Sequence, residues 1–304
     1  MLLSALCLFT ALAFTQAAPS QSPDAAALLK DGQKLLDEGN LEGAVEKYRA
    51  AVAADPQRFE AHDALGRALD LDGRYAEARE HLERAIALAP EDSKNQALAT
   101  MGTSYAFESR AEDAARYYRR AFDAQMEAKD PASAAATANA LGRVYLESGN
   151  LVKAEQWYRT GYETSRRLSN RPESQIRLWD MRWQNALGRI AARKGRRAVA
   201  LQHAAAVKRL LDKGGNDNQR TFYPYLLGYI HFHTRHNREA IASLKEGDQS
   251  DVFVLGLIAQ SYRRLHDEAH AREYFERVMA GTAHNINAAF SRPLARAYLK
   301  RGQR

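Results

Sequence analysis

Three short runs of the chain repeat one order of residues, Asx-Ala-Leu-Gly-Arg, and they contain side chains suited to anion recognition. They span residues 63–67, 139–143 and 185–189. In each run the Asp or Asn stands four residues before the Arg, a spacing that places both on one face of a helix. An Arg guanidinium holds a carboxylate through two parallel hydrogen bonds, and an Asn amide bonds the backbone of an extended peptide. The runs therefore indicate binding of an anionic or peptide ligand.

Motifs for catalysis and metal binding are poor by comparison. His231, His233 and His236 form a histidine-rich tract, but on an apolar face, a groove face and a turn they would point apart. His266 and His270 have the spacing of zinc metalloproteases, yet the second position lacks Glu and the pair spans an expected turn. The sequence has no phosphate-binding loop, dinucleotide-binding fingerprint or Gly-x-Ser-x-Gly turn. It predicts a protein that is not an enzyme, with no cofactor and no metal.

The elements that would position the three runs follow from a 34-residue period. Residues 25–58 and 59–92 have residues of the same types at the same offsets. One Gly lets two helices approach closely, a second Gly ends the first helix, and a Pro follows the second helix. The two copies contain Leu28, Gly32, Leu35, Gly39, Ala44, Tyr48, Ala51 and Pro56, and His62, Leu65, Gly66, Leu69, Gly73, Ala78, Leu82, Ala85 and Pro90.

This pattern resembles the tetratricopeptide repeat, a helix-turn-helix unit of 34 residues. The resemblance implies an all-α fold, a right-handed α-solenoid, because one unit cannot bury its apolar face alone. Weaker copies follow, and no segment alternates as a strand would, so we expect one domain, 25–304, of about seven repeats and about fifteen helices. The repeats are expected near 25–58, 59–92, 95–130, 135–170, 181–214, 221–250 and 252–285, with a capping helix at 292–301.

The resemblance also implies where a ligand would bind. In this family, first-helix residues line the concave groove, so the Asn and Arg side chains of the fourth and fifth repeats would share one stretch of it. This is similar to family members that clamp carboxylates, although the set here is richer in Arg. Pairing of these arginines with acids of the next repeat is the competing interpretation. The expected groove residues are Asn139, Arg143, Arg182, Asn185, Arg189 and Arg193.

The same positions of the sixth repeat carry aromatic side chains. An exposed aromatic patch beside a basic one is typical of a protein-binding surface. Burial of these rings by the last repeats is the alternative. The expected patch consists of Phe222, Tyr225, Tyr229 and Phe232.

The first residues have the layout of a secretory signal peptide. Leu2–Phe14 is an uncharged apolar run followed by small residues. We expect residues 1–17 to be cleaved, residues 18–24 to be flexible, and the protein to be periplasmic or secreted in a bacterium, with no membrane span after cleavage. An uncleaved anchor is the alternative. Cleavage would remove Cys7, the only cysteine, and with it any disulfide.

The charge is unevenly spread along the chain. Residues 24–109 hold 10 Lys/Arg and 17 Asp/Glu, residues 110–220 hold 22 and 12, and residues 221–304 hold 12 and 8. A basic middle attracts acidic partners. We therefore expect a non-catalytic protein-interaction scaffold that binds an acidic or C-terminal peptide segment of another protein. The alternative is a binder of an anionic polymer, nucleic acid or cell-envelope polysaccharide, although export disfavours nucleic acid.

Overall fold

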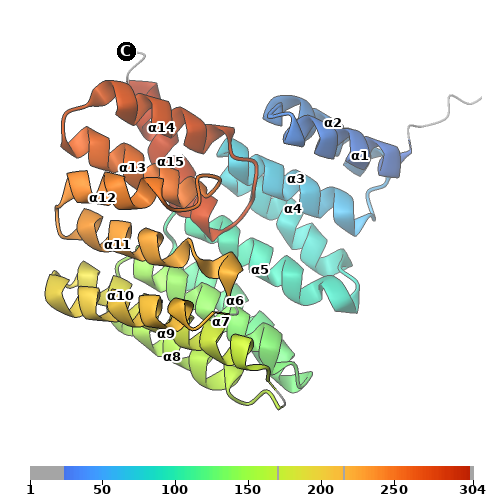
Figure 1. The fold of residues 1–304 in the computed structure, drawn as a ribbon. Helices are drawn as coiled ribbons and strands as arrows, with labels where there is room; N and C mark the ends of the chain where they lie inside the picture. The colour runs from blue at the N-terminus through green and yellow to red at the C-terminus, as the bar shows by residue number, and fades with distance from the viewer. Residues whose placement is uncertain (1–23, 170, 215, 302–304) are drawn as a thin grey trace, which may run out of the picture.

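The computed structural model describes residues 24–301 except 170 and 215, and within them it contains α-helices, one short 3-10 turn and no strand. This confirms the expected all-helical repeat solenoid with fifteen α-helices (Figure 1). The helices are α1 (Ala25–Asp37), α2 (Leu41–Ala54), α3 (Phe59–Asp72), α4 (Tyr75–Leu88), α5 (Glu91–Phe107), α6 (Ala111–Glu127), α7 (Pro131–Glu147), α8 (Leu151–Ser165), α9 (Glu173–Arg193), α10 (Arg197–Asp212), α11 (Phe222–His233), α12 (Asn237–Lys245), α13 (Val252–Arg264), α14 (Glu268–Ala280) and α15 (Ile286–Arg301).

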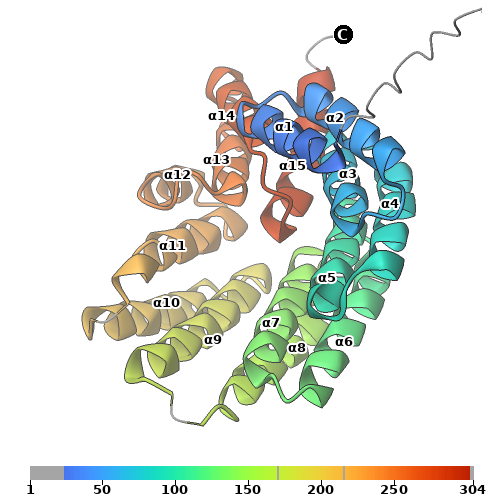
Figure 2. The same ribbon diagram turned by 90° about the vertical axis from the view of Figure 1, so that its right-hand side faces the viewer.

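Successive helices pack as hairpins, from α1 with α2 to α13 with α14, and each hairpin is one repeat. The first helices also pack on one another along the stack, as α9 does on α11 and α11 on α13. They therefore form a continuous inner layer, while the second helices α4, α6 and α8 lie on the outer side (Figure 2).

The turn between the two helices of a repeat requires a left-handed residue. Gly39 and Gly73 have φ of 80° and 91°, as the sequence predicts. In the third and sixth repeats Ser109 and Arg235 adopt φ of 57° and 65° instead. The turn geometry is thus kept where the glycine is replaced, at some cost in backbone strain.

Close approach of the paired helices explains the other repeat glycine. A Cβ added at Gly66 would lie 2.7 Å from the side chain of Leu82, closer than packed carbon atoms come. Ala44 and Ala78, on the facing helices, are fully buried. Enlarging either position would push the two helices of the repeat apart.

The middle of the solenoid is built from longer helices. The sequence predicts longer second helices in the third, fourth and fifth repeats, and α6, α8 and α10 have 17, 15 and 16 residues against 14 in α2 and α4. The first helices lengthen as well, because α7 has 17 residues and α9 has 21. Pro131 occupies the first turn of α7 and Pro172 caps α9, so both prolines begin helices rather than interrupt them.

The last helix closes the solenoid into a ring. α15 packs on α13 and α14, and also on α5 and α7 across the ring (Figure 2). Arg292 Nε and Arg296 Nη2 both donate to the carbonyl of Leu71, at the end of α3. The buried His284 Nε2 donates to Asp70 Oδ2 at 2.8 Å. Side chains of the last helix thereby donate hydrogen bonds to a carbonyl in the last turn of α3, in the second repeat.

The described chain begins with the capped helix α1 and ends with α15. The Asp24 carboxylate accepts from the backbone N–H of Ala26 and caps α1, while the predicted signal peptide, residues 1–17, lies outside the described residues. α15 begins at Ile286, ahead of the expected 292. Among the helices of residues 24–301, none combines the length and the apolar character needed to span a membrane.

Candidate functional site

Five of the six predicted groove residues line one cavity of about 300 Å³. Its walls come from α7, α9, α11, α13 and α15 and from the residues just before α11 and α13. We call it the arginine cavity. The predicted residues that line it are Asn139, Arg143, Arg182, Asn185 and Arg189.

Helical spacing explains why these side chains meet. Asn139 and Arg143 are one turn apart on α7, and Arg182, Asn185 and Arg189 follow one face of α9. Both faces line the same cavity. The paired Asx-Ala-Leu-Gly-Arg runs therefore supply opposite sides of one cavity.

Two of these arginines are buried without a full set of hydrogen bonds. Arg189 is 5% exposed, and its Nη2 donates to Tyr158 Oη at 2.9 Å, while its Nε and Nη1 have no partner. Arg143 Nε lies 2.9 Å from Glu147 Oε1 as an ion pair, but neither Nε nor Nη2 is aligned for a hydrogen bond. Tyr225 Oη is also buried without a partner. Besides Arg143 Nε, which has Glu147 beside it, four buried donor atoms around one cavity have no acceptor among the described residues.

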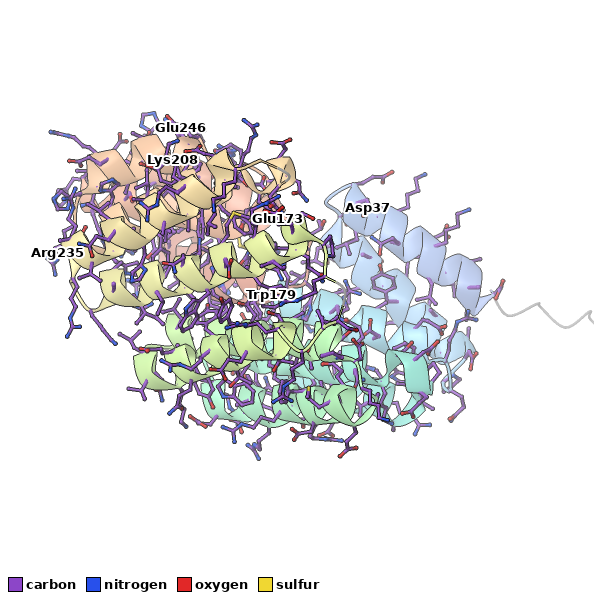
Figure 3. All side chains as sticks on the ribbon, turned by 60° about the horizontal axis from the view of Figure 1, so that its bottom comes forward. Asp37, Glu173, Trp179, Lys208, Arg235 and Glu246 are labelled. Atoms are coloured by element: carbon purple, nitrogen blue, oxygen red, sulfur yellow. The ribbon has the colours of Figure 1, made fainter. Side chains whose placement is uncertain are left out.

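The electrostatics of the cavity favour an anion. Burial lowers the pKa of Arg182, whose guanidinium lies 4.7 Å from the ring centre of Trp179 (Figure 3). Burial would also lower the pKa of Arg143, but Tyr225 and Glu147 raise it above its ordinary value. Burial raises the pKa of Tyr225, so its hydroxyl stays protonated and available as a donor. These groups carry positive charge or donor hydrogens at neutral pH.

Two helix ends add to this field. Thr221 precedes α11 and Asp251 caps α13, and both residues line the cavity. The N-terminal end of a helix carries partial positive charge, so the end of α11 favours a bound anion, whereas the Asp251 carboxylate already occupies the end of α13.

The carboxylates beside the cavity already have partners. Asp251 accepts from the backbone N–H of Phe253 at 2.8 Å and from Asn287 Nδ2 at 2.9 Å. Asp248 accepts from Ser250, which lowers its pKa. Among the described residues, neither Arg182 nor Arg189 forms an ion pair with a carboxylate, although Asp248 and Asp251 line the same cavity and offset part of its positive charge.

The sixth predicted residue lies elsewhere. Arg193 lines a neighbouring cavity of about 300 Å³, in which its Nη1 is 3.4 Å from Glu147 Oε2. It stands at the last residue of α9, beyond the turn that carries Arg189. The structure therefore separates Arg193 from the other five.

The expected exposure of the aromatic patch is wrong for two of its four residues. Tyr229 and Phe232 are 0% and 4% exposed, because α13 packs over α11 and stacks Phe253 on Tyr229. Phe222 and Tyr225 are partly exposed and line the arginine cavity. These two rings contribute a wall to the cavity rather than a separate surface.

Sequence reasoning missed five contributors to the cavity, which are Thr221, Asp248, Asp251, Val254 and Asn287. Asn287 comes from α15, which reaches the cavity only because the ring closes, and no local pattern signals that contact. The histidine tract has no role there. Within the part of the chain that the structure describes, no group of three His, Cys, Asp or Glu residues is placed to hold a metal ion.

The fold and this cavity define a helical-repeat solenoid with a concave inner face. Residues 29–93 and residues 94–167 match two models of the tetratricopeptide repeat. Over residues 29–167 the chain is therefore similar to tetratricopeptide repeats. Proteins of this family generally act as non-catalytic scaffolds for protein–protein interaction.

Solved structures share the fold at low sequence identity. The apo form of RapI is 14% identical with a TM-score of 0.56, over 91% of this chain and 99% of that one. A tetratricopeptide repeat protein from Parabacteroides merdae is 15% identical with a TM-score of 0.51, over 92% and 99%. Comparison with curated protein sequences gave no match.

Proposed function

We propose that this protein is a non-catalytic scaffold that binds an acidic or C-terminal peptide segment of a partner protein in its concave groove. A carboxylate of the partner occupies the arginine cavity. The observation that carries this proposal is the set of buried, unsatisfied donors of Arg143, Arg189 and Tyr225.

The energetics of burial explain why these donors imply a ligand. A buried polar group without a partner costs about 1–3 kcal/mol, and more if it is charged. A protein can keep such an unfavourable buried donor when a bound ligand supplies the missing acceptor. A carboxylate fits because it accepts from several N–H and O–H groups at once and neutralises the nearby guanidinium groups.

The remaining walls fit the end of a peptide. The amides of Asn139 and Asn185 stand beside the arginines and would bond the peptide backbone, and Phe222 and Val254 give an apolar wall for a side chain. The volume of about 300 Å³ suits one or two residues rather than a folded surface.

An anionic polymer fits the same cavity poorly. The guanidinium nitrogens of Arg143 and Arg189 are buried, so the repeated charges along a polymer backbone could not all reach them. A chain end or a single acidic side chain enters without this difficulty.

A matched pair of peptides tests the proposal. Acetyl-trialanine with a free carboxylate should bind the full-length protein more tightly than the same peptide with a C-terminal amide, as measured by calorimetry or NMR titration. Arg189→Gln should remove the preference. Arg177→Gln on the same helix, which removes an arginine paired with Glu173 outside the cavity, is the matched control and should keep it. Equal binding of acid and amide by the wild-type protein would refute the proposal.

We also propose that the protein is exported. The support is the apolar run that begins the sequence, and the test is given in the Discussion.

A further inference from the structure

The turns inside the later repeats lie along one edge of the ring, on the left side of Figure 1 for the fifth to the seventh repeat. Contacts join neighbouring turns in this row. Arg193 Nη1, at the end of α9, is 3.4 Å from Glu147 Oε2, at the end of α7, and Arg264 Nη1, at the end of α13, donates at 2.7 Å to the carbonyl of Phe232 in α11. We call this surface the turn edge, and it consists of residues 147–153, 193–199, 233–239 and 264–270.

The charge of corresponding turns changes sign along the solenoid. From the last residue of the first helix to the third residue of the second, the turns of the first three repeats (37–43, 72–77 and 107–113) hold 2 Lys/Arg and 8 Asp/Glu. The turn edge, over the same positions of the last four repeats, holds 8 and 4. Even the left-handed turn position of the sixth repeat, which Gly adopts without strain, is occupied by Arg235, at the outer end of the molecule in Figure 3.

Several cations of the turn edge have no acidic partner. Arg196, Arg235 and Arg238 are exposed, and none of them forms an ion pair with a carboxylate of the described residues. The acids of the last two turns stand instead at helix N-termini, where the helix dipole attracts them: Glu239, Asp267 and Glu268. The turn edge therefore presents excess positive charge to the solvent.

Exposed apolar side chains lie among these cations. Val152, Val199 and Leu265 belong to the turn edge and are 67%, 40% and 37% exposed. Leu294, at 49%, lines the cavity that contains Arg193, at the same ends of the first helices. Four of the five large apolar side chains that are exposed in the described part of the chain thus lie at one edge. Such side chains gain free energy when they leave water for an apolar phase.

We propose that the turn edge docks the protein on the surface of an anionic phospholipid bilayer. The arginines of the turns lie at the level of the lipid phosphates, while Leu265 and Leu294 enter the boundary between headgroups and acyl chains. Interfacial binding depends on this combination, because cations attract anionic lipids and apolar side chains add buried area. A soluble acidic polymer would neutralise the cations but leave the apolar side chains in water. The inference is independent of the proposed peptide binding, since no turn-edge residue lines the arginine cavity.

Vesicles that differ in lipid charge test the role of the arginines. The full-length protein should co-sediment with vesicles of phosphatidylglycerol and phosphatidylcholine but not with phosphatidylcholine alone, and salt should weaken the binding. The double variant Arg196→Gln with Arg235→Gln should weaken it about twentyfold, because each cation at the surface contributes about fivefold. Arg120→Gln with Arg209→Gln is the matched control. It removes two exposed cations from α6 and α10, away from the edge, and should weaken binding less than about twofold.

The apolar contribution is tested with a matched pair of exposed residues. Leu265→Ser should weaken vesicle binding about threefold to tenfold, whereas Ile176→Ser on α9, where the side chain is also 37% exposed, should not. Both changes are on the surface and should leave the unfolding midpoint unchanged. Soluble polyglutamate should bind more weakly than the anionic vesicles.

Four results would overturn the proposal. Absence of binding to the anionic vesicles, or equal binding to neutral ones, would exclude an anionic bilayer as the partner. Equal losses in the two double variants would show attraction by net charge alone. Polyglutamate binding as tight as vesicle binding, or vesicle binding that Leu265→Ser does not change, would assign the turn edge to a soluble acidic partner instead.

Discussion

Replacing Arg189 and its partner together should make the unliganded protein more stable. The guanidinium of Arg189 is buried with two nitrogens unsatisfied, and its one hydrogen bond goes to the buried Tyr158 hydroxyl. A site that keeps such a group for binding gives up stability in the absence of its ligand. The double variant Arg189→Met with Tyr158→Phe removes the unsatisfied donors and both members of the hydrogen bond at once.

The structure sets the size of the effect. Each unsatisfied buried donor costs about 1–3 kcal/mol, and the lost charged hydrogen bond contributed about 1.5–3 kcal/mol. Arg189→Met alone leaves the Tyr158 hydroxyl unpaired, so its gain and loss roughly cancel. The double variant avoids that loss, and we expect a net stabilisation of about 1–2 kcal/mol, or a rise of a few degrees in the unfolding midpoint.

Thermal unfolding of the two single variants, the double variant and the wild type forms a double-mutant cycle. Arg159→Met on the neighbouring helix α8 is the control and should change the midpoint little, because Arg159 is exposed and its pair with Glu155 is on the surface. A double variant that unfolds at a lower temperature than the wild type would show that Arg189 holds the repeats together. The competing structural interpretation of these arginines would then be correct.

Three further predictions concern the ring, pH and export. Arg292→Ala should lower the free energy of unfolding by about 2–4 kcal/mol and speed hydrogen exchange in α15, because it removes three hydrogen bonds and leaves the Met279 and Gly281 carbonyls without the guanidinium donor, whereas the exposed Arg301→Ala should do neither. Burial lowers the pKa of His233 to about 3, so on acidification protons bind the unfolded chain before the folded one. The free energy of unfolding should therefore be largest above about pH 6.5 and fall towards about pH 3. His233→Phe should flatten this slope, whereas His270→Ala, an exposed control, should not. Residues 1–23 fused to a periplasm-dependent reporter should direct its export with trimming near residue 17, and a purified protein that still begins at residue 1 would contradict this.

Local signals account for most of what the sequence predicts about the fold. The turn at Gly73 and the close approach at Gly66 depend on residues within one repeat, so a single copy of the pattern is enough to place them. The face shared by Arg182, Asn185 and Arg189 follows from helical spacing alone. Predictions of this kind need no knowledge of distant contacts.

Ring closure depends on contacts that no local pattern records. His284 meets Asp70, and Arg292 meets the end of α3, across more than two hundred residues. The same limit explains the error in the aromatic patch. Tyr229 stands at a groove position of its own repeat, but α13 and Phe253 arrive from the next repeat and bury it.

The ring gives the arginine cavity a property that an open solenoid would lack. In an open stack Arg143 and Arg189 would face water, and their charges would be well solvated and weakly selective. Here α13 and α15 bring Phe253 over Arg143, at 4.3 Å from its guanidinium, and Asn287 onto the cavity wall. Removing water strengthens the attraction between the guanidinium groups and a ligand carboxylate, and it also makes the empty cavity costly. Loosening α15 should therefore weaken carboxylate binding even though Arg292, which anchors that helix, does not line the cavity.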